Sequence, residues 1–179
     1  MPKQKSASNG AAKSAKSSKA AKSARADRPS GAHKSPTELV RDCADALFRA
    51  ADECCYQHDR ISRILTKSTV EAELSSAQRM CELTDKTMRD LSEAYQSTSA
   101  EVHPIGKDEA WWRNANTLWM ASREYLRRHK RCDVSSRQLQ QHGPDRLEAL
   151  HADYELEASA LLSLRHAADA YRQTRPTAA

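Results

Sequence analysis

Residues 35–64, SPTELVRDCADALFRAADECCYQHDRISRI, decide how the rest of the chain is interpreted. They open with a capping box, in which Ser35 is the N-cap, Pro36 occupies the first helical position and Glu38 reaches back to the cap. Mostly apolar or small side chains then recur alternately three and four residues apart: Val40, Cys43, Leu47, Ala50, Cys54, Gln57, Ile61 and Ile64. This spacing places one stripe on one side of an α-helix, so an amphipathic helix is predicted.

The same periodicity continues through the chain and is interrupted at a second capping box, Ser68–Glu71, around Pro104, and from the polar residues 132–142 to Gly143. A short helix within residues 132–142 is an alternative to a loop there. The predicted helices span about residues 36–67, 69–99, 107–131 and 144–174. Long amphipathic helices with short connections predict an all-α fold: an antiparallel, up-down-up-down four-helix bundle over residues 35–175, with residues 176–179 disordered. A dimer built from two helical hairpins is the alternative, because heptads do not identify their partner.

Residues 1–34 have a different composition. Nine basic residues and one acid, Asp27, give this segment a formal charge of +8, whereas the remaining residues carry −3 within a total of +5. The basic residues are Lys3, Lys5, Lys13, Lys16, Lys19, Lys22, Arg25, Arg28 and Lys34. No Leu, Ile, Val, Phe, Trp or Tyr precedes Leu39, so too little apolar surface is present to offset the entropy of folding. A disordered, basic, low-complexity N-terminal tail is predicted.

Positive charges spread along such a tail neutralise phosphates and release counterions, which gives salt-sensitive and sequence-independent binding. The Lys/Ala/Ser composition is similar to that of the tails of linker-histone-like and other bacterial nucleoid-associated proteins. A second basic cluster is expected to support the tail: Arg127, Arg128, Lys130 and Arg131. The helix dipole alone also explains basic residues near a helix C-terminus, and a solubilising or organelle-targeting tail is the alternative for residues 1–34.

Several functional classes lack support in the sequence. No apolar run is long enough to span a membrane, and no secretory signal or phosphate-binding loop is recognisable. Five cysteines without a C-x-x-C motif are expected to be reduced, which favours a cytoplasmic location. We therefore expect a non-enzymatic protein without a cofactor that binds nucleic acid or another polyanion non-specifically, with a homodimer as a further possibility.

A metal- or cofactor-holding bundle, either ferritin-like or thiol-based, is the first functional alternative. Glu148 and His151 have the Glu-x-x-His spacing of ferritin-like di-metal sites, but no second copy exists and the helical periodicity turns Glu148 away from the core. Folding back at Lys67 and Pro104 is expected to bring Cys54 and Tyr125 close to Cys81, and Glu157 is a further polar residue on a seam that such a site could use. Thiolates at such a place select copper or zinc, although buried cysteines commonly pack as small hydrophobes.

Three further expectations concern individual residues and the surface. Glu157, the one acid on an apolar seam, is expected to pair with an Arg or Tyr. Cys132 follows the basic cluster, and a solvent-accessible position there would make it a reactive thiol. Trp112 and Trp119 lie on the same face and are candidates for a core or partner-binding edge.

A phasin-like granule or surface-coating protein, whose helices open to present their apolar seams, is the remaining functional alternative.

Overall fold

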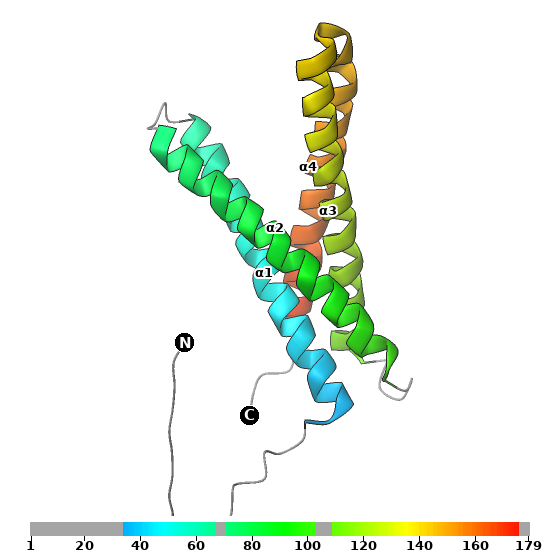
Figure 1. Ribbon diagram of the computed structural model, residues 1–179. Helices are drawn as coiled ribbons and strands as arrows, with labels where there is room; N and C mark the ends of the chain where they lie inside the picture. Colours follow the sequence, from blue (N-terminus) through cyan, green and yellow to red (C-terminus); the bar gives the residue numbers. More distant parts are fainter. Residues whose placement is uncertain (1–33, 67–70, 103–108, 176–179) are drawn as a thin grey trace, which may run out of the picture. The chain divides into compact units, whose positions relative to one another are not determined.

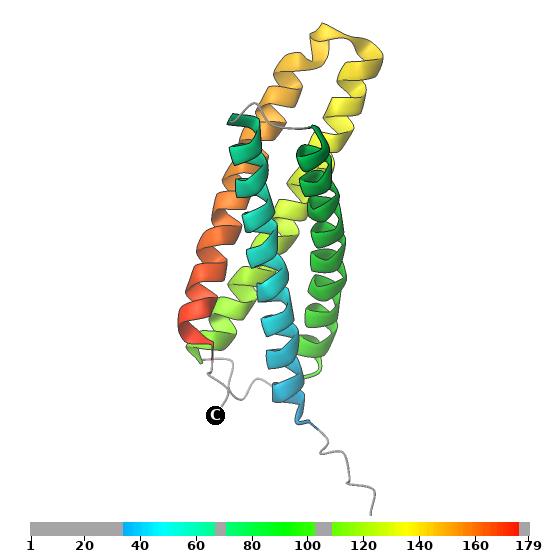
Figure 2. The same ribbon diagram turned by 90° about the vertical axis from the view of Figure 1, so that its left-hand side faces the viewer.

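The computed structural model describes residues 34–66, 71–102 and 109–175, and this part of the chain contains helices and no strands. The helices are α1 (Pro36–Thr66), α2 (Glu71–Ala100), α3 (Ala110–His142), the short 3-10 helix η1 (Pro144–Arg146) and α4 (Leu147–Thr174). Figures 1 and 2 show the four long helices running alternately up and down. The predicted all-α class is confirmed.

The N-terminus of α1 has the predicted capping box. The backbone N–H of Ser35 donates to Glu38 Oε2 at 2.6 Å, and the N–H of Glu38 donates to Ser35 Oγ at 3.3 Å. These reciprocal bonds satisfy two of the N–H groups that a helix start leaves without partners. The second predicted capping box, the tail over 1–33 and the C-terminal residues 176–179 lie outside the described residues.

The predicted end of the third helix at residue 131 is wrong, because α3 continues to His142. Residues 132–142 are polar but contain no helix breaker, and two of them face polar groups of α4. Within this extension, Ser135 Oγ donates to Asp153 Oδ2 at 2.5 Å. The helix ends at Gly143, which has a φ of 76° and donates its N–H to the carbonyl of Leu139. Glycine adopts this left-handed conformation without a Cβ clash.

Helix α1 packs along α2, α3 packs along α4, and α1 also contacts α4. The core comes from all four helices and is richest where the start of α1 meets the end of α4, with Leu47, Met88, Leu118 and Leu164 at its centre. Three tyrosines are fully buried there: Tyr95, Tyr125 and Tyr171. No described helix is apolar enough over sufficient length to cross a membrane.

The register between α1 and α2 differs from the one expected from a turn at Lys67. Cys54 Sγ donates to Asp85 Oδ1 at 3.6 Å, so its hydrogen-bond partner on α2 lies one turn beyond Cys81. Cys43 Sγ lies 3.7 Å from Thr98 Oγ1, which supports the same register near the other end of the pair. The shift places a carboxylate, rather than a second thiol, opposite Cys54.

Candidate functional site

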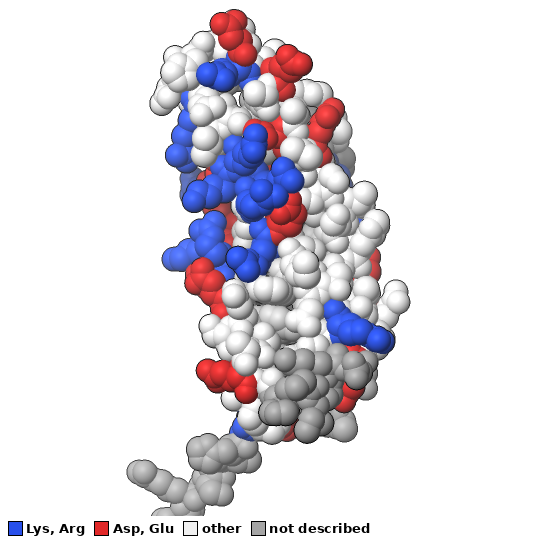
Figure 3. Space-filling view, turned by 90° about the vertical axis from the view of Figure 1, so that its right-hand side faces the viewer, with Lys and Arg blue, Asp and Glu red and all other residues white. Residues whose placement is uncertain are grey.

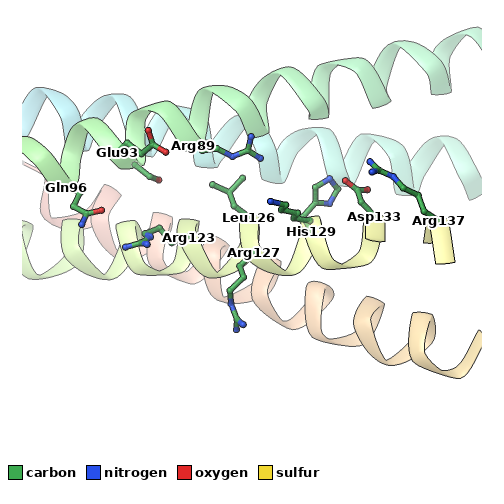
Figure 4. Close-up of a pocket in the computed structure, with 11 residues that line it drawn as sticks. Arg89, Glu93, Gln96, Arg123, Leu126, Arg127, His129, Asp133 and Arg137 are labelled. Carbon is green, nitrogen blue, oxygen red and sulfur yellow. The ribbon is translucent and has the colours of Figure 1, made fainter. Parts of the chain in front are cut away.

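A groove with a volume of about 640 Å³ runs between α2 and α3 (Figure 4). Positively charged side chains dominate its lining, and the face shown in Figure 3 carries a cluster of Lys and Arg. The lining residues are Arg89, Ser92, Glu93, Gln96, Arg123, Leu126, Arg127, His129, Lys130, Asp133 and Arg137. We call this feature the α2/α3 groove. Its five Lys and Arg residues outnumber its two carboxylates, which makes it a candidate site for anions.

The structure divides the basic cluster predicted from the sequence. Arg127 and Lys130 line the α2/α3 groove. Arg128 is half-buried and donates to Glu124 Oε1 at 2.7 Å, while Arg131 pairs with buried Asp153 at 2.7 Å. Arg128 therefore pairs within α3 and Arg131 pairs with α4, and neither lines the groove.

Lys34 is the one predicted tail cation within the described residues. Its ammonium lies 2.5 Å from Asp42 Oδ2 at the exposed start of α1, and this pairing raises the pKa of Lys34. The other predicted tail cations lie outside the described residues: Lys3, Lys5, Lys13, Lys16, Lys19, Lys22, Arg25 and Arg28.

The arginines of the groove differ in how they are held. Arg127 makes two hydrogen bonds to Glu124, at 2.7 and 2.9 Å, and Figure 4 shows it pointing away from α2. Hydrogen bonds from Arg127 and Arg128 lower the pKa of Glu124 to about 2. The Arg123 guanidinium lies 5.2 Å from the centroid of the Trp119 ring, a cation–π distance.

Arg89 reaches the groove from α2, and Lys130 and Arg137 reach it from α3. All three side chains are exposed, and within the described ranges none of the three forms an ion pair. Their charges are available to a ligand. Because Arg137 lies beyond residue 131, the longer α3 extends the cationic surface past the expected end of the helix.

Beneath the groove lies an ionic network that the sequence interpretation did not find. His129 Nδ1 lies 2.5 Å from Glu157 Oε1, and His129 Nε2 lies 3.2 Å from Asp85 Oδ2. The hydrogen bond with Glu157 is the main cause that raises the pKa of His129 to about 9, so this imidazole is protonated at neutral pH. Glu157 was expected to pair with an Arg or Tyr, and its partner is this histidine instead.

The carboxylates of this network have opposite shifts. Burial raises the pKa of Glu157, but the hydrogen bonds from His129 and Cys132 lower it by a larger amount. The pKa of Glu157 therefore lies below the ordinary value for a glutamate. Burial raises the pKa of Asp85 above its ordinary value, against the lowering effect of His129. Glu157 is therefore the stronger ionic partner of the imidazolium.

A second histidine joins the network from α1. His58 Nε2 lies 2.7 Å from the Tyr125 hydroxyl, and the Tyr125 ring stacks on His129 with centroids 5.8 Å apart. Burial is the main cause that lowers the pKa of His58, which is therefore neutral at neutral pH. With Asp85 from α2 and Glu157 from α4, each long helix contributes at least one member of the network.

A second cavity, of about 470 Å³, lies on the other side of α3 and is bordered by α1 and α4. Ile61, Ala158 and Leu161 form apolar walls, while His129 and Asp133 border both this cavity and the α2/α3 groove. The ionic network consequently lies between two openings, and His129 keeps 30% of its side chain exposed.

The two cysteines of the expected polar cluster are buried. Burial is the main cause that raises the pKa of Cys54 strongly and that of Cys81 to about 11. Both thiols are therefore protonated at neutral pH in the metal-free protein. Residues 34–66, 71–102 and 109–175 contain no group of three or more His, Cys, Asp or Glu arranged to hold a metal ion.

Three other sequence expectations are resolved by burial. Cys132 was expected near solvent, but α3 continues past it and buries it to 3% exposure; burial raises its pKa to about 12. Trp112 is buried, and Trp119 is partly buried against the core. Glu148 is exposed, as the periodicity predicted, and His151 is exposed as well.

Comparisons of this chain with protein-family models, curated proteins and solved structures found no match.

Proposed function

We propose that this protein binds nucleic acid or another polyanion without sequence specificity, through the basic segment 1–34 and the α2/α3 groove together. The observation that carries the proposal is the row of cations along the groove, three of which lack ion-pair partners in the described residues. Arg123 and Arg137 are separated by about 21 Å along α3, at 1.5 Å per residue. A row of this length matches several successive phosphates better than one small anion.

The proposed mode of binding is electrostatic. Each Lys or Arg that neutralises a phosphate releases condensed counterions, so the logarithm of the affinity falls linearly with the logarithm of the salt concentration. The described groove residues include no Phe, Tyr or Trp, and the one aromatic ring among them, the imidazole of His129, lies against Glu157 and the Tyr125 ring. Base stacking is therefore not part of the proposed contact. Contacts to phosphates position a protein without reading sequence.

We propose a binding protein rather than an enzyme. Burial raises the pKa values of the Cys54, Cys81 and Cys132 thiols and of the Tyr125 hydroxyl, so these four groups are held in their protonated, weakly nucleophilic forms. All five cysteines are free, which supports the proposal that the protein works in a reducing compartment such as the cytoplasm.

The test measures binding of the full-length chain to duplex DNA over a series of salt concentrations. One variant replaces the eight basic residues of the segment 3–28 with Gln, and a second carries Arg89→Gln and Lys130→Gln. We expect both variants to bind more weakly and with a shallower salt slope, the first more strongly affected, and two DNA sequences of equal length to bind equally. Affinity that ignores salt, or that is unchanged in both variants, would refute the proposal.

A further inference from the structure

The floor of the α2/α3 groove contains a hydroxyl group that the fold does not use. Ser92 is 3% exposed, and its Oγ has no hydrogen-bond partner. Other hydroxyl side chains of α2 are satisfied: Thr84, Thr87, Ser97 and Thr98 each donate to the backbone carbonyl four residues earlier. Leaving a buried hydroxyl unpaired costs free energy, so an unpaired hydroxyl at the floor of a cationic groove suggests that a ligand supplies its hydrogen-bond partner.

Trp119 connects this hydroxyl-bearing residue to an arginine of the groove. The Trp119 indole N–H donates to the backbone carbonyl of Ser92 at 3.1 Å. The guanidinium of Arg123 lies over the same indole, 5.2 Å from the ring centroid. One partly buried side chain of α3 therefore fixes the backbone at Ser92 and also supports Arg123.

A neutral hydroxyl donor beside guanidinium groups is a combination that proteins use to bind phosphate oxygens. We propose that the α2/α3 groove holds a phosphate group at its floor, where Ser92 Oγ donates a hydrogen bond to a phosphate oxygen while Arg89 and Arg123 balance its charge. The inference rests on the proposed polyanion function and specifies the chemistry of one contact. The phosphate belongs either to a nucleic-acid backbone or to a free inorganic polyphosphate.

The other charged and polar groups of the groove differ from Ser92 in how they can contact an anion. The imidazolium of His129 contributes positive charge, but Glu157 and Asp85 already occupy its two ring nitrogens. Glu93 and Asp133 also line the groove and repel an anion. Gln96 also carries an uncharged donor, but its side chain is exposed, whereas Ser92 is buried. Ser92 is therefore the buried uncharged donor that distinguishes hydrogen bonding to phosphate from general attraction to positive charge.

Isothermal titration of the full chain with inorganic tripolyphosphate at fixed ionic strength tests the contact. Ser92→Ala should weaken binding by roughly 10- to 100-fold, the range for a lost hydrogen bond to a charged group. Ser97→Ala is the matched control, because Ser97 lies on the same helix outside the groove and its hydroxyl bonds the backbone of Glu93. Alanine suits both helical positions, and circular dichroism checks that the two variants unfold at the wild-type temperature or above.

A second pair of variants tests the charged partner. Arg123→Gln should also weaken tripolyphosphate binding, while Arg79→Gln, at an exposed position of α2 outside the groove, should leave it unchanged. Equal affinity of the Ser92→Ala and Ser97→Ala proteins for both tripolyphosphate and DNA overturns the inference. If the salt-dependent DNA binding of the full chain persists in that case, the proposed function stands without this contact.

A single-stranded oligothymidylate distinguishes the two sources of phosphate. Loss of affinity for both probes in Ser92→Ala supports a nucleic-acid backbone in the groove, and loss for tripolyphosphate alone supports a free polyphosphate. A further outcome separates the two proposals. If tripolyphosphate binding depends on Ser92 but the chain shows no salt-dependent DNA binding, the phosphate contact is supported and the proposed binding of nucleic acid is refuted.

Discussion

Replacing Glu157 with Gln is the most informative perturbation of the ionic network, because it removes one charge and keeps the shape of the side chain. Glu157 accepts the 2.5 Å contact from His129 Nδ1, and 12% of its side chain is exposed. The variant leaves His129 beside Asp85 alone, at 3.2 Å. Folding then loses the main interaction that stabilises the imidazolium.

The size of the loss follows from the pKa of His129. A rise from the ordinary value of 6.5 to about 9 corresponds to about 3 kcal/mol between the two protonation states. Because 30% of the His129 side chain is exposed, solvent screening reduces this to about 2 kcal/mol, of which Glu157 supplies the larger part. We therefore expect Glu157→Gln to lower the free energy of unfolding by about 1–2 kcal/mol at neutral pH.

The effect must depend on pH in a defined direction. A raised histidine pKa stabilises the folded state fully below about pH 6.5, and this contribution is lost as the pH rises through about 9. The lowered pKa of Glu157 keeps its carboxylate charged down to below its ordinary value of 4.5. The difference between variant and wild type should consequently be largest between about pH 5 and 7 and should vanish or change sign near pH 10.

Urea unfolding followed by circular dichroism at several pH values measures this difference. Glu155→Gln is the matched control, since Glu155 lies on the same helix with 73% of its side chain exposed and pairs only loosely with His151, at 3.6 Å. It should change the stability by no more than a few tenths of a kcal/mol at any pH. A Glu157→Gln loss that is equal at pH 6 and pH 10, or absent at both, refutes the assigned charge states.

Other predictions follow from single contacts. Ser35→Ala should cost about 0.5–2 kcal/mol in thermal unfolding, because its Oγ caps the Glu38 N–H; an unchanged midpoint contradicts this role. Leu118→Ala, at a fully buried position, should cost about 2–5 kcal/mol in urea unfolding, and a loss below about 1 kcal/mol argues against the core assignment. Iodoacetamide should alkylate partly exposed Cys43 much faster than Cys132, whose pKa burial raises to about 12, and equal labelling in peptide mass spectra contradicts that burial.

The fold was predictable because its signal is repeated along each helix. The seam of α1 runs from Val40 to Ile64, and both ends of this seam are buried in the structure. The end of α3 was not predictable from periodicity, because the residues beyond 131 are mostly polar and the buried one among the last ten, Ser135, is itself polar. Ser135 gains its place in the helix from a bond to Asp153, a residue whose proximity depends on how α3 and α4 pack. Composition alone makes the same residues resemble a loop.

The site was only partly predictable, for a related reason. Arg127 and Lys130 stand out as charges close together in sequence, and both line the groove. Arg89 and Ser92 line the groove only because α2 packs beside α3 in one particular register. A prediction that is wrong by one helical turn in this register does not place these two residues in the groove. Pairing of His129 with Glu157 depends in the same way on the α3/α4 register, although the periodicity placed Glu157 on a seam.

The ionic network also bears on how the bundle assembles. The pairs α1/α2 and α3/α4 join neighbouring segments, so each pair forms with little loop-closure entropy. The contact of His129 with Glu157 forms within the α3/α4 pair. The contacts of His58 with Tyr125 and of Asp85 with His129 join one pair to the other and exist only after the two pairs have docked. A docked arrangement shifted by one turn leaves buried charges without partners, which costs several kcal/mol. The network therefore selects one alignment of the two pairs and couples their unfolding into a single cooperative event.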